Sequence, residues 1–172
     1  MTGKVVWHMT MSLDGFIGDR DDKLDWSFGS TPPSELAADV IRTTGAFMCG
    51  GRLVDAVGEN RPYGGAWTGP VLIYTRKDPV SNPVPEFTYV SGDIREVVAD
   101  GLEAADGKNL VVTGGAVPRL SLEAGVVDEI VLHIVPVLLG EGTRFYDSPG
   151  VDPTKLELLT TEGMNFRFRV VR

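Results

Sequence analysis

Two glycine pairs each follow a short apolar run. Gly50-Gly51 follows 47–49, Gly114-Gly115 follows 111–113, and the sequence predicts a helix directly after each pair. Glycine lets the backbone approach a phosphate without a Cβ in the way, and a helix N-terminus offers unpaired N–H groups to an anion. Two such turns on neighbouring strands could hold a diphosphate from both sides. The alternative is that the glycines only permit tight turns and close helix packing; two copies in one small domain favour phosphate binding.

Cations follow a third apolar run. Thr75-Arg76-Lys77 comes at the end of the strand predicted over 70–75. A hydroxyl and two cations at a strand end suit the 2′-phosphate that distinguishes NADPH from NADH, although a solvated charge pair is the alternative. Arg52 lies in a first helical turn, where the helix dipole disfavours a cation, and a nearby anion would relieve that conflict.

The acid and base groups are few. Glu35, at a predicted helix start, is the best-placed acid, with a plain first-turn carboxylate as the alternative. His8 and His133 lie in apolar strands, where histidines are usually hydrogen-bonded core residues; if both face one cleft with Glu35, a proton relay or a substrate-binding role follows. Two histidines and the single Cys49 are too few for a closed metal site, so no metal is expected. We expect Cys49 to be an inert buried thiol.

Regular elements must position these groups. Alternating or continuous apolar runs predict strands over 4–12, 46–49, 70–75, 87–90, 109–113, 128–138, 155–161 and 165–171. Helices are expected from the cap-like segment 31–35 to Gly45, from the first glycine pair to about Val57, after Asp93, and over 116–124. Residues 13–29 are expected to form a long functional loop. The alternation predicts an α/β fold with a mostly parallel sheet covered on both faces, plus a C-terminal antiparallel hairpin.

The bulk composition narrows the function. The 172 residues fit one domain, 1–172, and 42% of them are hydrophobic. The formal net charge of −8 argues against nucleic acid or an anionic membrane as a partner. One cysteine fits a reducing compartment, and neither a signal peptide nor a membrane span is recognisable, so a cytoplasmic protein is expected.

The ordered motifs resemble a known group of enzymes. Leu13 to Gly18, Gly51-Arg52, Thr75 to Lys77 and Gly114 to Ala116 occur in the order found in dihydrofolate reductases. They are also similar to the RibD-like reductase domain of riboflavin biosynthesis, the C-terminal domain of a bifunctional deaminase-reductase. Residues 12–15 and 125–140 look more like that second branch. The resemblance covers nearly the whole chain and implies a three-layer αβα dihydrofolate-reductase-like fold.

The resemblance also implies residue roles. Thr10, Ile17 and Gly18 would lie beside a nicotinamide ring. The phosphates of NADPH would be held by Gly51, Arg52 and Leu53 on one side and by Gly114, Gly115, Ala116 and Val117 on the other. Thr75 and Arg76 would meet the adenosine ribose phosphate. Glu35 would be the acid of the first helix, and His133 would take the place of the strand residue that supports it.

Some positions depart from the family patterns. Asp39 stands roughly where dihydrofolate reductases place a substrate-stacking aromatic, which disfavours folate. Riboflavin-type domains usually have a threonine in the loop after the second strand and a glutamate before the glycine pair. In this chain the first of those places holds Leu53 or Arg52, and the second holds Thr113. We count Thr113 among the candidate cofactor-binding residues. One cysteine cannot supply the zinc site of a deaminase, so we expect no deaminase within these 172 residues.

The sequence therefore predicts an NADPH-dependent reductase of a small pyrimidine- or pteridine-like heterocycle, of the riboflavin-biosynthesis type. His8 and Asp39 are its candidate substrate-binding residues. A dihydrofolate-reductase-type activity and a non-catalytic dinucleotide-binding module are the alternatives. The resemblance also implies a homodimer that pairs through strands near the C-terminus.

Overall fold

The computed structural model describes residues 3–29, 33–57, 61–76 and 84–172. Its strands are β1 (Val5–Ser12), β2 (Phe16–Gly18), β3 (Thr44–Gly50), β4 (Val71–Tyr74), β5 (Thr88–Val90), β6 (Asn109–Val112), β7 (Glu129–Val135), β8 (Thr143–Arg144), β9 (Leu156–Glu162) and β10 (Asn165–Val170). Its α-helices are α1 (Glu35–Thr43), α2 (Gly51–Val57), α3 (Ile94–Ala104) and α4 (Ala116–Glu123). Two 3₁₀ segments span Asp25–Ser27 and Pro62–Gly65.

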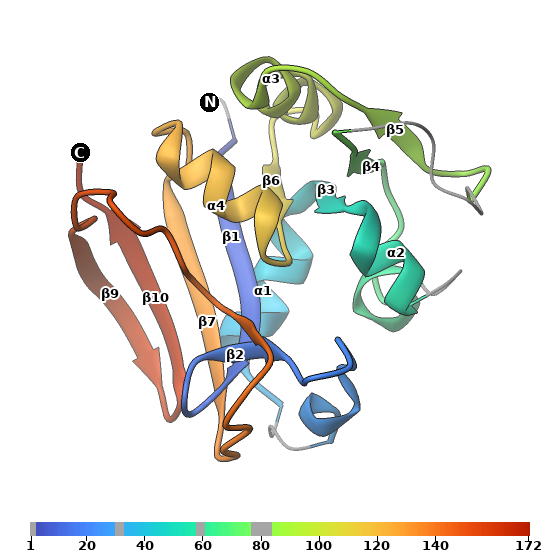
Figure 1. The fold of residues 1–172 in the computed structure, drawn as a ribbon. Helices are drawn as coiled ribbons and strands as arrows, with labels where there is room; N and C mark the ends of the chain where they lie inside the picture. The colour runs from blue at the N-terminus through green and yellow to red at the C-terminus, as the bar shows by residue number, and fades with distance from the viewer. Residues whose placement is uncertain (1–2, 30–32, 58–60, 77–83) are drawn as a thin grey trace.

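Eight strands form one sheet in the order β5-β4-β3-β6-β1-β7-β10-β9 (Figure 1). The pairs from β5 to β7 are parallel, and β10 runs antiparallel to both of its neighbours. The predicted α/β fold with a mixed, mostly parallel sheet and a C-terminal hairpin is therefore confirmed. The small antiparallel pair of β2 and β8 was not predicted.

Helices cover both faces of the sheet. Val97 and Val98 of α3 and Val117 of α4 join one buried apolar cluster, which also contains Trp7 of β1. Val40 of α1 and Val54 of α2 join a second cluster on the opposite face. The parallel strands β3, β4, β6 and β7 are mostly buried along their length, which explains why their sequences are largely apolar rather than alternating.

Local signals account for the helix starts. Ser34 caps α1, and its hydroxyl accepts a hydrogen bond from the N–H of Ala37. Asp93 caps α3 in the same way, through the N–H of Arg95. The helix α1 ends at Thr43 rather than at Gly45, because Thr44 already belongs to the neighbouring strand β3.

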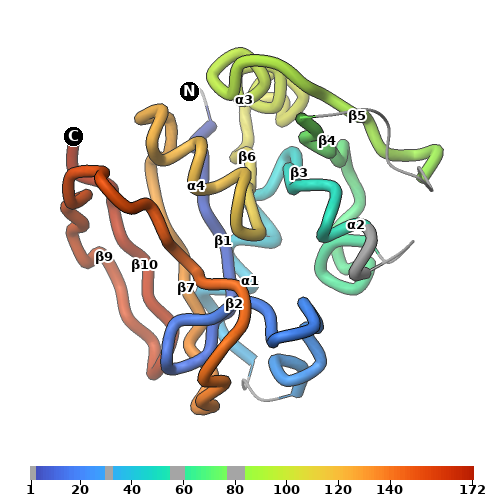
Figure 2. The backbone as a smooth tube through the Cα atoms, viewed as in Figure 1, coloured from blue at the N-terminus to red at the C-terminus, as the bar shows by residue number. Residues whose placement is uncertain are grey.

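The predicted long loop is ordered by contacts with a distant segment. Figure 2 shows residues 13–29 beside residues 136–146 at one end of the sheet. The Asp14 carboxylate accepts hydrogen bonds from the N–H groups of Leu139 and Gly140 and from the Ser12 hydroxyl. The Ser12 hydrogen bond, followed by those backbone bonds, lowers the pKa of Asp14 to about 2. Asp14 therefore organises this loop.

None of the helices in the described part of the chain is long and apolar enough to cross a bilayer.

Candidate active site

The two glycine pairs converge in space. Gly50-Gly51 and Gly114-Gly115 line one cavity of about 540 Å³, which we call the arginine-lined cavity. They meet because β3 and β6 are adjacent and parallel, so the turns that follow these strands lie at the same edge of the sheet. Gly114 has a φ of +88°, a left-handed conformation that favours glycine.

At the rim of this cavity, the backbone at Gly142 passes very close to the backbone at Gly18. A Cβ on Gly142 would lie 2.1 Å from the carbonyl oxygen of Gly18. Only glycine therefore lets the segment before β8 pass over the end of β2. Gly18, Gly142 and Thr143 all line the arginine-lined cavity, so this contact brings the 13–29 loop to its rim.

Positive charge gathers around the arginine-lined cavity. The described lining includes the four arginines Arg52, Arg76, Arg119 and Arg144 against the two aspartates Asp22 and Asp147. This local excess of positive charge stands in a chain whose formal net charge is −8. An anion bound here would therefore be held by local groups against the overall charge of the protein.

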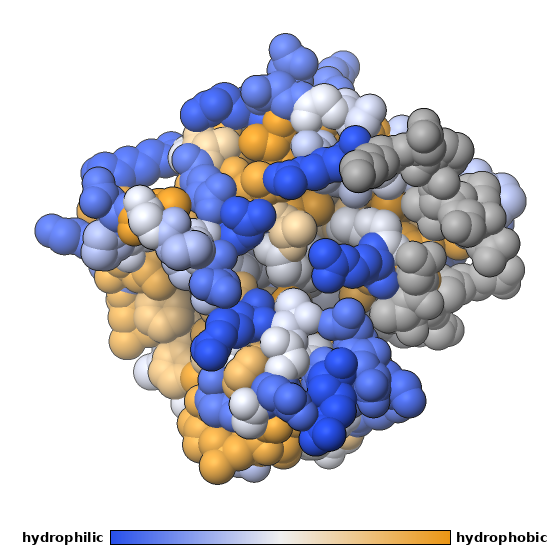
Figure 3. All heavy atoms as spheres, viewed as in Figure 1, coloured by the Kyte–Doolittle hydropathy of each residue, from blue (hydrophilic) through white to orange (hydrophobic). Residues whose placement is uncertain are grey.

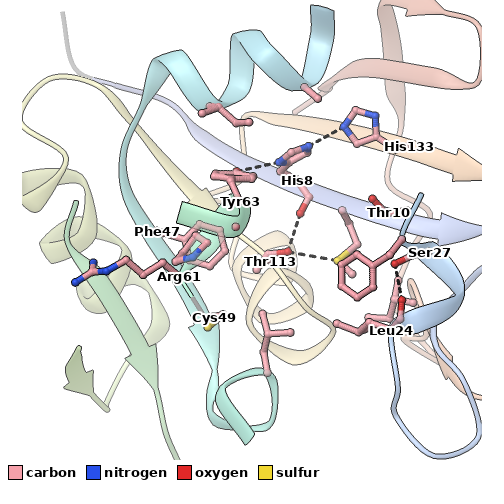
Figure 4. Close-up of a pocket in the computed structure, with 18 of the residues that line it drawn as sticks. His8, Thr10, Leu24, Ser27, Phe47, Cys49, Arg61, Tyr63, Thr113 and His133 are labelled. Carbon is pink, nitrogen blue, oxygen red and sulfur yellow. Dashed lines mark hydrogen bonds between the residues drawn. The ribbon is translucent and has the colours of Figure 1, made fainter. Parts of the chain in front are cut away.

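A larger cavity of about 840 Å³ lies on the α1 side of the sheet (Figure 4). We call it the apolar cavity. It is lined by apolar side chains of α1, β3 and β4, which include Ala37, Ile41, Phe47, Cys49, Val71 and Ile73. The polar groups of its lining come mainly from β1, β7, β10 and the 3₁₀ segment Pro62–Gly65. Few polar groups in an apolar hollow are typical of a small-molecule site.

The two cavities adjoin. Met9, Ile17, Leu24 and Leu53 line both of them. A ligand in the arginine-lined cavity can therefore contact one in the apolar cavity at these four residues. This continuity is the main geometrical feature of the site.

A chain of hydrogen bonds crosses the wall of the apolar cavity. The Nδ1 atom of His8 lies 2.9 Å from the Tyr63 hydroxyl, and its Nε2 atom lies 2.7 Å from Nε2 of His133 (Figure 4). The Nδ1 atom of His133 lies 2.6 Å from Oδ1 of Asn165. The two histidines share a face because His133 pairs in register with Thr10, two residues along β1 from His8.

Burial keeps these rings neutral. Burial, followed by the charges of His133 and Arg167, lowers the pKa of His8 from 6.5 to about 3. Burial also lowers the pKa of His133, against the opposing effect of its hydrogen bond to Asn165. Burial raises the pKa of the Tyr63 phenol and raises that of the Cys49 thiol to about 12, so Cys49 is not a thiolate nucleophile.

Most predicted cofactor residues lie at these cavities. Those at the arginine-lined cavity are Ile17, Gly18, Gly50, Gly51, Arg52, Leu53, Arg76, Gly114, Gly115, Ala116 and Val117. Thr10 and Thr113 instead line the apolar cavity, as do His8 and His133. The Thr113 hydroxyl donates to the carbonyl oxygen of His8. Thr75 lines neither cavity, and Lys77 lies outside the described residues.

Glu35 lies away from both cavities. It is exposed, and the N-terminus of α1 already has an acid partner from the other end of the chain. The Glu162 carboxylate accepts from the N–H groups of Glu35 and Leu36, at 3.2 and 3.1 Å, and from the Ser34 hydroxyl. A proton donor must contact its substrate, so this placement does not support the acid role predicted for Glu35.

Asp39 also lies outside both linings. Its carboxylate accepts hydrogen bonds from Arg42 and, at 2.7 Å, from Arg167 of β10. It therefore ties α1 to the sheet rather than facing the apolar cavity. This geometry does not support the substrate role predicted for Asp39.

Several lining residues of the two cavities are not predicted from the sequence. Arg119 and Arg144 add charge to the arginine-lined cavity, while Tyr63 and Asn165 complete the histidine chain. Arg119 could have been found from its place one turn inside the helix that follows Gly114-Gly115. The Pro62-Tyr63-Gly64-Gly65 turn carries an aromatic among turn-forming residues, which is a weaker signal.

Comparison with known proteins identifies the family. A family model described as the RibD C-terminal domain matches residues 3–166, so the chain belongs to that family. A relative in Bacillus subtilis (strain 168), with the name "Uncharacterized protein YwjB", is 24% identical over 94% of this chain and 92% of its own.

Solved structures share the fold. A "Putative riboflavin biosynthesis protein" from Shewanella sp. PV-4 has a TM-score of 0.81 and 21% identity, covering 98% of this chain and 99% of that one. The diaminohydroxyphosphoribosylaminopyrimidine deaminase/5-amino-6-(5-phosphoribosylamino)uracil reductase of Thermotoga maritima has a TM-score of 0.72 and 15% identity, covering 99% of this chain and 57% of that one. A dihydrofolate reductase from Enterococcus faecalis, complexed with NADP(H) and RAB-propyl, has a TM-score of 0.63 and 15% identity. The match covers 99% of this chain and 98% of that one. The predicted dihydrofolate-reductase-like fold is therefore confirmed.

Proposed function

We propose that this protein is an NADPH-dependent reductase of a small pyrimidine- or pteridine-like heterocycle, of the riboflavin-biosynthesis reductase type. The observation that carries the proposal is the junction of the two cavities at Met9, Ile17, Leu24 and Leu53. One cavity has the charge and backbone of a phosphate site, and the other is an apolar hollow large enough for a heterocycle. Membership of the RibD C-terminal domain family supports the same function.

The residues of the arginine-lined cavity fit a phosphorylated dinucleotide. The turn at Gly114 presents backbone without a Cβ, and α4 begins directly after it. Arg52, Arg76 and Arg119 line the same cavity, and a guanidinium group can form two-pronged hydrogen bonds with phosphate oxygens. Arg119 also forms an ion pair with Glu123 at 2.9 Å. In such a cofactor, Arg76 at the end of β4 would hold the 2′-phosphate.

Bound NADPH would supply a hydride, which carries two electrons to an unsaturated carbon of the substrate, and the product gains a proton at the neighbouring atom. The protein would align the two ligands and exclude water from the place where they meet. Ile17, Leu24 and Leu53 exclude water where the two ligands would meet, and the walls of the apolar cavity orient the substrate ring. No described residue of that lining is an aspartate or glutamate, so a carboxylic acid there does not supply the proton.

The lack of a carboxyl group in the described lining of the apolar cavity is the observation that favours the alternative function, a non-catalytic dinucleotide-binding module. A protein with a cofactor cavity and no carboxyl group in the described lining of the adjoining cavity can bind without reducing. The same observation counts against a dihydrofolate-reductase-type activity, since Glu35 does not reach the apolar cavity. The proton would then have to come from water or from a neutral side chain of the lining.

Two measurements test the proposal. NADPH should quench the tryptophan fluorescence of the protein on titration, and its absorbance should fall when a phosphoribosylamino-pyrimidine is added as the oxidant. Failure of NADPH to bind would refute both the reductase and the binding module. Binding without turnover across a panel of pyrimidines and pteridines would favour the binding module.

We also propose that the protein is a homodimer. Leu156 and Leu158 of the edge strand β9 are 45% and 53% exposed, and they lie beside Val170 and Phe168 of β10 in the register of the hairpin. Figure 3 shows hydrophobic side chains gathered over these two strands. An apolar edge strand in water invites pairing with a second chain, which supports this assembly.

A further inference from the structure

The hydrogen-bond chain in the wall of the apolar cavity has a direction. It runs from Tyr63 through His8 and His133 to Asn165. A neutral imidazole has one N–H donor and one acceptor nitrogen. Each ring must therefore donate one hydrogen bond and accept the other. Once the donor is known for the hydrogen bond at one end, the donors of all the other hydrogen bonds in the series follow.

The fixed end is Asn165. Its Nδ2 atom lies 2.8 Å from the backbone carbonyl oxygen of Glu162, and a carbonyl oxygen can only accept. The amide nitrogen must face Glu162, so the Oδ1 atom faces Nδ1 of His133 at 2.6 Å. His133 therefore carries its proton on Nδ1, and its Nε2 is an acceptor.

The direction follows through the second ring. His8 Nε2 lies 2.7 Å from that acceptor, so it must carry the proton and donate. The Nδ1 atom of His8 is then an acceptor, and at 2.9 Å its donor is the Tyr63 hydroxyl. Tyr63 thus commits its only proton to the protein.

The Tyr63 oxygen keeps unused acceptor capacity. The Thr44 hydroxyl is a hydrogen-bond partner of the Tyr63 side chain, and it also lies 2.6 Å from the carbonyl oxygen of Val40, to which it donates. A phenolic oxygen has two lone pairs, so one acceptor position remains even with Thr44 at the other. Within the described part of the chain, no other group donates to this oxygen. Tyr63 lines the apolar cavity, where a bound molecule can supply the missing donor.

The backbone holds Tyr63 in this position. Its φ of +57° is left-handed, which is unusual for a bulky residue. The ring meets Phe47 edge to face, with the ring centroids 5.8 Å apart, and the hydroxyl is anchored to His8. Unusual backbone that is held by its surroundings occurs often at binding sites.

We propose that Tyr63 is a specificity-determining residue of the apolar cavity, which accepts a hydrogen bond from a ring N–H or amino group of a heterocyclic substrate. This inference rests on the proposed function, because it treats the apolar cavity as the substrate site. A substrate that turned a carbonyl oxygen or a ring-nitrogen lone pair to Tyr63 would set two acceptors against each other. The cavity therefore selects against such a ring.

The direction of the chain can be tested without any ligand. Long-range ¹H–¹⁵N NMR spectra of the full chain distinguish protonated from unprotonated imidazole nitrogens. The protein has two histidines, so a single His8→Gln variant assigns both. We expect the Nε2–H tautomer for His8 and the Nδ1–H tautomer for His133 at neutral pH. The opposite tautomer of either ring would overturn the inference.

The specificity can be tested with two neutral probes and no NADPH. Uracil carries two ring N–H donors, and 1,3-dimethyluracil carries none while keeping both carbonyls. Calorimetry should show that uracil binds more tightly, and that Tyr63→Phe reduces the ratio of the two affinities roughly tenfold, as for the loss of one hydrogen bond. Tyr146→Phe, which changes a phenol outside both cavities, should leave the ratio unchanged.

An affinity ratio that is the same in Tyr63→Phe and the natural protein would overturn the inference, and so would a lack of uracil binding. Because the probes are used without NADPH, these results are separate from those of the reductase test. A protein that oxidises NADPH but shows an unchanged ratio refutes the role of Tyr63 alone. A protein with the expected ratio that does not bind NADPH refutes the reductase.

Discussion

His8 and His133 face each other across 2.7 Å between their Nε2 atoms, with room for one proton between them. Protonation of the second nitrogen would set two N–H groups against each other. The positive charge of Arg167 lies near His8 and opposes protonation further, whereas Glu162 acts on His133 in the opposite sense. The pair is therefore a neutral structural unit at physiological pH.

This pair predicts how stability depends on pH. The pKa of His8 is about 3 in the folded protein and near 6.5 when unfolded, so the unfolded chain binds more protons between these values. The free energy of unfolding should therefore fall as the pH falls through this window. Between pH 7 and 5.5, His8 alone contributes a loss of up to about 1 kcal/mol, from about 1.4 kcal/mol per pKa unit.

Urea denaturation at pH 7, 6.25 and 5.5 measures this dependence. Several carboxyl groups, Asp14 and Glu162 among them, have lowered pKa values, but their contribution is lost only nearer their unfolded values of about 4. The window above pH 5.5 is thus governed by the two histidines. A free energy of unfolding that stays constant across it would contradict the prediction.

Arg76→Ala tests the cofactor preference. If Arg76 pairs with the 2′-phosphate, its removal should weaken NADPH binding roughly tenfold or more and leave NADH binding nearly unchanged. Fluorescence titration with each nucleotide gives both affinities. Arg95→Ala, an exposed arginine on α3 outside both cavities, is the matched control. Equal losses for the two nucleotides would refute the assigned role of Arg76.

Gly114→Ala tests the glycine turn. Gly114 has a φ of +88°, so a Cβ costs about 1–2 kcal/mol of strain, and nothing within 4 Å would clash with it. The turn would relax away from its present shape, and NADPH affinity should fall several-fold. Gly150→Ala has a similar φ of +81° and open space, but lies outside both cavities.

Both glycine variants should therefore lose similar stability, measured by thermal unfolding. Only Gly114→Ala should lose affinity for NADPH. If the two variants bind NADPH equally well, the turn at Gly114 is a structural feature and not a phosphate site.

Leu158→Glu tests the dimer. Leu158 is 53% exposed on the edge strand β9, so a charge there should cost little in the monomer and should disrupt an apolar interface. Sedimentation velocity should show a dimer for the natural chain and a monomer for the variant. Leu13→Glu alters a side chain that is 55% exposed in the 13–29 loop and should remain dimeric. A natural chain that sediments as a monomer would refute the dimer itself.

Local patterns were sufficient for much of the fold. The cap at Asp93, the apolar runs of the parallel strands and the glycine turns depend on neighbours within a few residues. These interactions are legible in the sequence because the residue types that make them have narrow local preferences. The placement of Gly50-Gly51 beside Gly114-Gly115 follows once β3 and β6 are recognised as adjacent parallel strands.

The sequence by itself therefore determined the α/β elements, the glycine turns and the two histidines on apolar strands. Only the tertiary structure decided that Glu162 caps α1 while Glu35 points to solvent, because that contact joins residues 127 positions apart. Likewise, Tyr63, His8, His133 and Asn165 come from four separate segments, and only strand register brings them into one hydrogen-bonded chain. Long-range register depends on the packing of the whole core, to which every strand contributes, and no local pattern encodes it.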